Sequence, residues 1–141
     1  MSTEIMSENF ATEVGTDLID VSRMYESLRY NSNIIRQIPM LVAVTFIKGR
    51  SGFERDGSYS TKKGDRWQMF DVGVACQSFC LAAKEQGLGT VIMGIFDEEK
   101  ITELLEIPPE RELAALIAVG WPDDDPQAPK RKAVTDLLEY K

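Results

Sequence analysis

Histidine is absent from this chain of 141 residues, and cysteine occurs only twice. Without histidine there can be no Ser-His-Asp triad and no Cys-His pair, so hydrolases that depend on these groups are excluded. A zinc site would have to be built from carboxylates and two thiols, which is an unusual ligand set. If the chain is an enzyme, we therefore expect a bound cofactor to carry the chemistry, with no metal and no catalytic side chain.

Long apolar runs and clustered positive charge are also scarce. The longest apolar run, "MLVAVTFI" at residues 40–47, is far too short to cross a bilayer. The polar, acidic start "MSTEIMSENF" lacks the basic and apolar parts of a secretory signal. The net charge is −7, whereas nucleic-acid binding needs a clustered basic surface. We expect a cytoplasmic protein that binds neither membranes nor nucleic acid.

What the chain does contain is the composition of one globular domain, predicted to cover residues 1–141. Hydrophobic residues make up 43% and charged residues 28% of the chain, which is enough for a single core of ordinary size. Cys76 and Cys80 lie four residues apart in a helical pattern, so they share one helix face. We interpret them as small core residues, because a disulfide fits poorly within one helical turn.

Hydrophobic periodicity predicts alternating helices and strands. In chain order, the expected elements are a frayed tail (1–11), a helix (12–37), a buried strand (40–47), a polar loop or lid (48–65), a mostly apolar helix (66–86), a strand (90–96), a short helix capped by Asp97 (98–106), a fully apolar strand (112–121), a stiff acidic linker (122–129) and a tail with some helical spacing (130–140). This order predicts an α/β or α+β sandwich with the long helix packed on a sheet.

The helix predicted at residues 66–86 has an unusually wide apolar face, which suits burial against a sheet or a partner subunit. That face comprises Met69, Val72, Ala75, Cys76, Phe79, Cys80 and Ala83, and the opposite strip comprises Gln68, Gln77 and Lys84. Asp71 is expected in the first turn, where the helix dipole favours a carboxylate. The aromatic residues Trp67, Phe70 and Trp121 could line a ligand pocket, but aromatics more often fill cores, and we favour the core.

The stretch "GLGTVIMGIF" places three glycines around an apolar run. A phosphate-binding glycine loop follows a strand and opens a helix, whereas Gly87 and Gly89 follow a helix and open a strand, so we reject that reading. Gly87 is predicted to end the helix in a left-handed conformation, and Gly89 is predicted to be a turn residue. Gly94 marks either a bulge or the close approach of a ligand, and the residues alone do not decide between the two.

From Phe70 to Pro122 the chain resembles the nitroreductase family of FMN-dependent oxidoreductases. The shared pattern is a D-x-G-x-A-x-Q helix that ends in L-A-A-x-x-x-G-L-G-T, then M-G-x-F-D, an E-L-L-x-I-P helix and an apolar strand ending in G-W-P. The tail "PKRKAVTDLLEY" and the strand that follows Pro39 also resemble family segments. The resemblance covers about the last two thirds of the chain. It implies a nitroreductase-like sandwich with a mixed central sheet flanked by helices.

The resemblance also implies a cofactor, a reaction and a partner. It places the flavin ring against the backbone of Ile92, Met93 and Gly94, and the FMN phosphate against Lys130 and Arg131. On the residue types alone, the basic run at 130–132 reads instead as a solvated turn that balances the acidic linker. The implied protein is a homodimer that takes hydride from NAD(P)H and passes it through flavin to a nitroaromatic, quinone or similar small-molecule acceptor.

The arginine-rich start and the N-x-Q-P-W stretch that family members use to contact FMN are not found in residues 1–37. We therefore expect an N-terminally short version of the family, or one whose N-terminus has diverged. The alternative function is a catalytically inactive or truncated member that acts as a dimeric flavin-binding or interaction module.

Overall fold

The computed structural model describes residues 24, 26–28, 35–36, 38–124 and 127–140. The predicted tail at 1–11 and most of the predicted helix at 12–37 lie outside the described residues. The elements in order are β1 (Met40–Ile47), α3 (Arg66–Glu85), β2 (Gly89–Met93), α4 (Glu98–Leu104), β3 (Arg111–Gly120) and the 3-10 turn η2 (Val134–Asp136).

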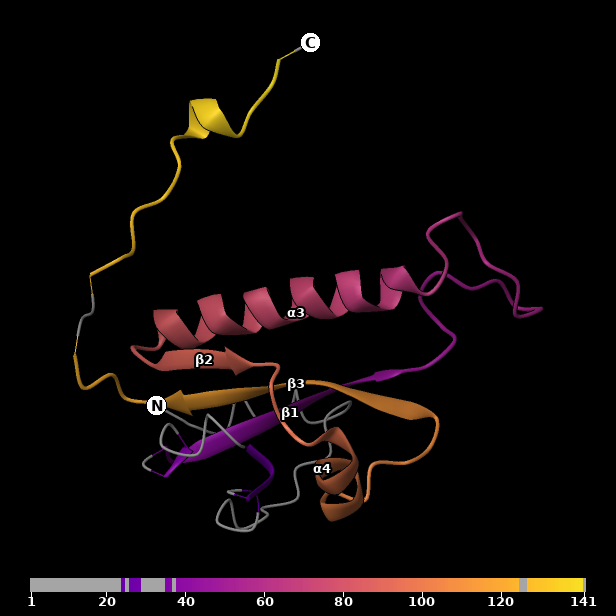
Figure 1. Ribbon diagram of the computed structural model, residues 1–141, viewed down its shortest axis with the longest axis horizontal. Coiled ribbons are helices and arrows are strands. Elements are labelled where there is room, and N and C mark those ends of the chain that lie inside the picture. Colours follow the sequence, from indigo (N-terminus) through magenta and orange to yellow (C-terminus); the bar gives the residue numbers. More distant parts are fainter. Residues whose placement is uncertain (1–23, 25, 29–34, 37, 125–126, 141) are drawn as a thin grey trace.

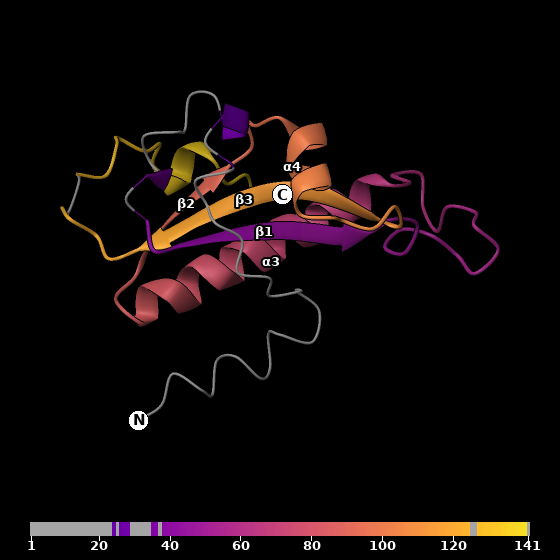
Figure 2. The ribbon, with the colours of Figure 1, turned by 90° about the horizontal axis from the view of Figure 1, so that it is seen from below.

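The described strands form a sheet in the order β1-β3-β2, and both pairings are antiparallel, where a mixed sheet was expected. The long helix α3 lies along one face of the sheet, and α4 lies against the opposite face (Figures 1 and 2). The chain is thus an α+β sandwich of helix, sheet and helix. The short helix α4 begins as predicted, because the side chain of Asp97 accepts a hydrogen bond from the amide of Lys100 at 3.2 Å.

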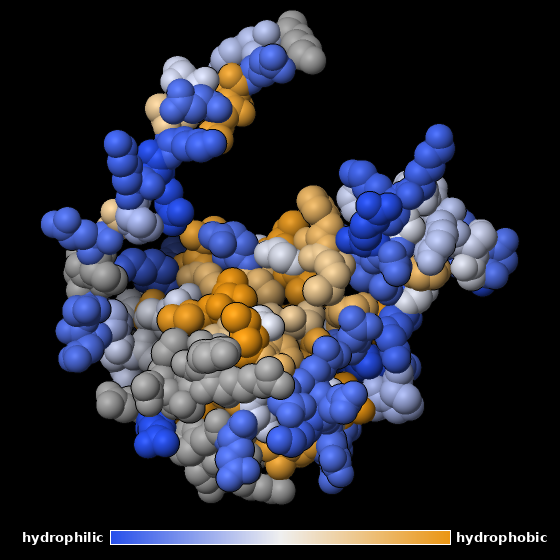
Figure 3. All heavy atoms as spheres, in the orientation of Figure 1, coloured by the Kyte–Doolittle hydropathy of each residue, from blue (hydrophilic) through white to orange (hydrophobic). Residues whose placement is uncertain are grey.

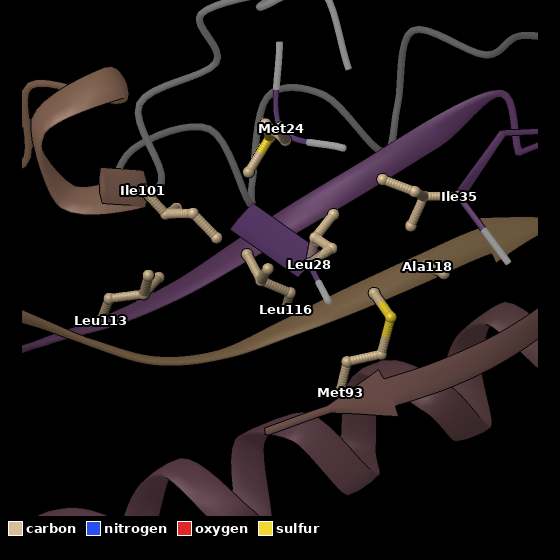
Figure 4. Packing of buried hydrophobic residues seen from close by; sticks show 8 residues of the cluster. All are labelled: Met24, Leu28, Ile35, Met93, Ile101, Leu113, Leu116 and Ala118. Carbon is tan, nitrogen blue, oxygen red and sulfur yellow. The ribbon is translucent and has the colours of Figure 1, made fainter. Parts of the chain in front are cut away.

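The central strand β3 is buried on both faces, which explains its unbroken apolar run. Ile117 and Val119 face α3, whereas Leu116 and Ala118 face the α4 side. On the α4 side, side chains from β2, β3, α4 and the described residues before β1 converge in one cluster, shown in Figure 4 and comprising Met24, Leu28, Ile35, Met93, Ile101, Leu113, Leu116 and Ala118. The β1–β3 register shifts between Val44 and Thr45, so β3 carries one extra residue there. Because side chains alternate between the two faces of a strand, this extra residue puts Leu113 on the same face as Leu116 and Ala118.

The prediction that residues 40–47 form a buried strand is right in extent but wrong in depth. The strand spans Met40–Ile47, yet its inner residues are only half-buried and its two ends are exposed. The reason is position, because β1 is an edge strand of the described sheet and is covered by fewer neighbours than β3. An apolar run alone does not distinguish an edge strand from a central one.

The long helix ends one residue earlier than predicted, and its terminus is the one expected from Gly87. That glycine has a φ of +77°. Its amide donates to the carbonyl of Lys84 at 2.9 Å, and the amide of Leu88 donates to the carbonyl of Ala83 at 3.0 Å. These two bonds form a Schellman motif, which satisfies carbonyls that the helix leaves free and turns the chain into β2.

Gln68 was predicted on the solvent-facing strip of the helix, and this prediction is wrong. Its side chain is only 9% exposed, and its Oε1 accepts a hydrogen bond from the backbone amide of Gly49 at 2.6 Å. Asp71 likewise lies beyond the first turn and accepts a hydrogen bond from the hydroxyl of Ser51. Both side chains thus bind α3 to the loop that precedes it. The sequence did not predict these contacts, because helical spacing cannot show which polar side chains will hydrogen-bond to a distant loop.

We predict that Gln68→Leu destabilises the protein by about 1–3 kcal/mol, because the Gly49 amide would lose its acceptor in a partly buried position. Urea unfolding followed by circular dichroism measures this change. Gln86→Leu is the matched control, because Gln86 is exposed at the end of the same helix, and we expect its effect to be within about 0.5 kcal/mol. Equal effects for the two variants would show that the Gln68 bond contributes nothing.

The segment 48–65, predicted as a polar loop or lid, is a hairpin held by its own hydrogen bonds. Phe53 and Tyr59 form an isolated β-bridge with ring centroids 5.0 Å apart. The turn between them is closed by Asp56, which accepts from both the amide and the hydroxyl of Ser58. The Ser58 hydroxyl, more than its amide, holds the pKa of Asp56 below its ordinary value. The loop prediction is therefore confirmed, and a lid function remains a prediction.

Candidate functional site

The first group of predicted cofactor residues lies where β2 ends. The β2–β3 pairing runs without a register shift from Gly89–Gly120 to Met93–Leu116. Gly94 follows the last paired residue, so it is not a bulge in this ladder. A Cβ atom added at Gly94 would meet no atom of the described part of the chain within 4 Å. The backbone at Gly94 is therefore open to whatever approaches it, and a side chain there would intrude on that approach rather than on the fold.

The two residues before Gly94 divide between the core and the surface. Met93 is 3% exposed and belongs to the cluster on the α4 side. It can therefore face a ligand only with its backbone. Successive residues of a strand point to opposite faces, so Ile92 points toward the α3 side, where it is 49% exposed. Of the three, only Ile92 offers a side chain to a ligand at this edge.

The second group, Lys130 and Arg131, lies in the C-terminal tail. Together with Lys132, Ala133 and Asp136 these residues line a shallow hollow that is open to solvent. Lys100 and Asp97 form an ion pair at 3.3 Å, and neither belongs to the basic run. Lys130, Arg131 and Lys132 make no ion pair with Asp123 or Asp124, the acidic linker residues that the structure describes. Both interpretations of the basic run, a phosphate contact and a solvated turn, stay predictions.

The structure does not bring the two groups together within one chain. In Figure 1 the tail leaves the end of β3, rises away from the sheet and ends far from the tip of β2. Every described residue from 121 to 140 is exposed. The predicted ring contacts and the predicted phosphate contacts therefore occupy separate parts of the described chain.

The aromatic residues are more exposed than predicted. We expected Phe70 and Trp121 in the core, but they are 60% and 76% exposed. Trp67 is half-buried, donates its indole N–H to the hydroxyl of Thr61 at 2.7 Å, and lies 4.6 Å beneath the ammonium group of Lys63. Its ring meets that of Phe70 edge to face at 5.4 Å. None of the three lies in a described cavity near Gly94.

The inward face of α3 is narrower than predicted. The helix residues in the cluster that packs on the sheet are Val72, Cys76, Phe79 and Cys80, and Ala83 is also buried. Met69 was expected on this face but is exposed, and it lines a shallow outward hollow with Phe70, Gly73, Val74, Gln77 and Ser78. Figure 3 shows apolar side chains in a band across this side of the molecule, over α3 and β2. The helix therefore carries more apolar surface than the sheet covers.

The two cysteines take the core role that was predicted for them. Burial, with a smaller effect of neighbouring Cys80, raises the pKa of the Cys76 thiol. Because the raised pKa keeps this thiol protonated at neutral pH, it suits packing rather than nucleophilic attack. Among the described residues no group of histidine, cysteine or carboxylate side chains could hold a metal ion. No helix in the described part of the chain has the length and apolarity to cross a membrane.

A family model for the nitroreductase family matches residues 3–121. The chain belongs to the nitroreductase family. The match begins well before Pro39, where the resemblance seen in the sequence began, and it ends before the tail that carries Lys130 and Arg131. The fold agrees with this assignment, because the predicted nitroreductase-like α+β sandwich is the architecture of the solved relatives.

Three relatives illustrate the similarity. A nitroreductase family protein from Streptococcus pneumoniae superposes with a TM-score of 0.70 at 20% identity, over 84% of this chain and 72% of that one. A protein from Staphylococcus epidermidis, proposed to be an NAD(P)H:FMN oxidoreductase, superposes with a TM-score of 0.69 at 16% identity, over 84% and 69%. The 5,6-dimethylbenzimidazole synthase of Rhodospirillum rubrum is 30% identical over 63 residues, which are 45% of this chain and 30% of that protein. The match thus spans less than a third of this curated relative.

Proposed function

We propose that the chain binds FMN and acts as an NAD(P)H-dependent oxidoreductase that reduces nitroaromatics, quinones or similar small molecules. Membership of the nitroreductase family supports a flavin-dependent role. The observation that carries the proposal is the open backbone of Gly94 at the end of β2. The absence of histidine is consistent with it, since hydride transfer through a flavin needs no general base from this residue.

The described residues fit a flavin in one respect that can be checked on the structure. The end of β2 presents bare backbone beside the half-exposed Ile92, so a flat ring can approach without meeting a side chain at Gly94. Backbone amides of Met93 and Gly94 would stabilise negative charge on the ring, because fixed donors do not need to reorganise. When bound, FMN supplies the hydride-accepting and hydride-donating chemistry.

The phosphate would be held by Lys130 and Arg131. Arginine suits phosphate because its planar guanidinium makes paired, charge-assisted hydrogen bonds. Both side chains are exposed and make no ion pair with another described residue.

The same proposal includes a cytoplasmic homodimer, in which the outward apolar face of α3 forms the interface. The family's arginine-rich start and N-x-Q-P-W stretch were not found in residues 1–37. Nearly all of these residues lie outside the described residues.

Arg131→Ala tests the phosphate contact. We expect the variant to lose FMN affinity about ten- to hundredfold, because one charge-assisted hydrogen bond is worth roughly 1.5–3 kcal/mol. Riboflavin differs from FMN only by the phosphate, so its affinity should stay the same. Flavin fluorescence titrations of both ligands against both proteins measure the difference. Lys84→Ala, a surface change on α3, is the control for a general effect of removing positive charge.

Three outcomes are informative. If Arg131→Ala leaves the preference for FMN over riboflavin unchanged, the basic run is a solvated turn. If the wild-type protein binds neither flavin, the proposed cofactor is wrong. If it binds FMN but does not oxidise NADH or NADPH with quinone or nitroaromatic acceptors, the chain is the non-catalytic flavin-binding module that is the alternative.

A further inference from the structure

Residues 48–66, which we call the basic hairpin, carry a charge opposite to that of the rest of the chain. This segment comprises the hairpin at 48–65 and Arg66, the first residue of α3. Six of its residues are lysine or arginine and three are aspartate or glutamate, so its net charge is +3. The whole chain carries −7, which leaves −10 for all other residues. A surface of this kind attracts a partner of complementary charge.

The positive charge is concentrated at the base of the basic hairpin, where its two arms lie side by side. The amide of Ser60 donates to the carbonyl of Gly52 at 2.9 Å, and a Cβ on Gly52 would collide with the carbonyl oxygen of Gly64. The tip, at residues 54–56, holds one arginine between two acids. The exposed cations of the base are Lys48, Arg50, Lys62, Lys63 and Arg66.

The backbone of the basic hairpin is held in place although the segment adds nothing to the core. The indole N–H of Trp67 donates to the hydroxyl of Thr61, and the side chain of Gln68 accepts from the amide of Gly49. Neither core cluster of the described residues contains a residue from 48–66. In Figure 1 the segment projects beyond the N-terminal end of α3. A surface fixed in advance loses less conformational entropy when a partner binds.

Two cations of the base are positioned but not neutralised. The ammonium group of Lys63 lies 4.6 Å from the ring centroid of Trp67. The Nε of Arg66 donates to the carbonyl of Lys63 at 3.1 Å. Within the described part of the chain, neither cation forms an ion pair with a carboxylate. The terminal nitrogens of the Arg66 guanidinium are therefore open to an acceptor, and a carboxylate matches their paired geometry.

We propose that the base of the basic hairpin is a docking surface for an acidic segment of another protein. This inference does not depend on the proposed flavin chemistry. Glutamate or aspartate side chains of the partner pair with the exposed cations. An aromatic surface lies beside them, because Tyr59 is 59% exposed and its ring centroid is 5.0 Å from that of Phe53. Arginine and aromatic residues together are typical of protein–protein interfaces.

A short acidic protein segment fits this surface better than a nucleic acid or an anionic membrane does. Salt screens exposed charges over about 10 Å at 0.1 M. A short segment therefore interacts mainly with the base, whereas an extended polyphosphate surface also meets the acidic remainder of the chain. The tip carries Glu54, Arg55 and Asp56, and these charged residues are unsuited to insertion between lipids.

Charge reversal at the base tests the proposal on the full chain. The probe is a fluorescein-labelled synthetic peptide of glutamates with one central phenylalanine, and fluorescence anisotropy at low salt measures its affinity. The test variant combines Arg50→Glu with Lys62→Glu, because neither side chain forms an ion pair with another described residue. We expect at least about a tenfold loss of affinity, since like charges placed opposite each other across an interface repel.

The matched control combines Arg55→Glu with Lys84→Glu. It reverses the same two residue types and changes the net charge equally, but at the tip of the hairpin and near the C-terminal end of α3. We expect its affinity to stay within about twofold of the wild type. Thermal unfolding checks that both variants fold. If the reversal at the base prevents folding, Arg50→Gln with Lys62→Gln replaces it, with an expected loss of about three- to tenfold.

Each outcome decides for or against the docking surface. A loss confined to the base variant, with binding that weakens as salt is raised, supports it. Equal losses in the two double variants overturn it, because the peptide then responds only to net charge, and so does a wild-type chain that does not bind the peptide. Tighter binding of a single-stranded oligonucleotide or of phosphatidylglycerol vesicles through the same residues shows a polyphosphate partner instead. A changed sedimentation of the base variant without peptide shows that the surface binds a second copy of this chain, which also overturns the proposal.

Discussion

Gly94→Val is expected to abolish FMN binding while leaving the fold intact. A Cβ at this position meets no atom of the described residues within 4 Å, and Gly94 does not have the positive φ that would make a side chain strained. The branched side chain of valine would instead occupy the space in which a flat ring meets the backbone. We expect a loss of at least about a hundredfold in FMN affinity, equivalent to about 2.7 kcal/mol. Fluorescence titration measures the affinity, and thermal unfolding without flavin measures the fold.

Gly87→Val is the matched control and should show the reverse pattern. Gly87 has a φ of +77° at the end of α3, and among the described residues a Cβ there also meets nothing within 4 Å. The cost is therefore conformational, roughly 1–2 kcal/mol for a residue with a side chain in the left-handed region. We expect lower stability with unchanged FMN affinity. Unchanged affinity in Gly94→Val, at unchanged stability, would refute the role of Gly94 in binding.

Ile117→Ala is expected to cost about 2–5 kcal/mol of folding free energy, because it deletes a buried side chain and leaves a cavity. Ile117 is 1% exposed in the central strand and packs against α3. Its register partner across the β2–β3 pair is Ile92, which is 49% exposed. Ile92→Ala is thus a control of the same residue type in the same sheet. We expect it to cost about 1 kcal/mol or less, since half of its surface is already in water.

Urea unfolding in the absence of flavin compares the two isoleucine variants, with the midpoint and the slope recorded separately. Flavin titration should rank them in the opposite order. Ile92→Ala changes a side chain at the proposed ring contact, whereas Ile117→Ala acts only through the fold. Similar stability losses in both variants would mean that β2 is more deeply covered than its exposure indicates. A dimer that buries Ile92 would produce that result only at concentrations where the dimer persists.

Local patterns in the sequence were sufficient to predict several elements of the fold. The apolar runs located β1 and β3 to within one residue, because short unbroken apolar runs bounded by turn residues favour strands whether they lie at the edge or at the centre of a sheet. Gly87 predicted the end of α3, because the left-handed terminus is a property of a few consecutive residues. The strand predicted at residues 90–96 ends at Met93. The residues after Met93 lead instead into helix α4, whose N-cap is Asp97.

The sequence by itself excluded catalysis that depends on histidine, because a chain without this residue cannot perform it in any fold. It also carried the family resemblance and located the ends of α3 and β3 to within one residue. Only the tertiary structure decided that β3 rather than β1 is central, that Gln68 is buried, and that Phe70 and Trp121 are exposed. It also placed the end of β2 and the C-terminal tail apart (Figure 1). Periodicity records which residues share a face of one element, whereas burial and proximity depend on the segments that pack against that face from elsewhere in the chain or from another copy.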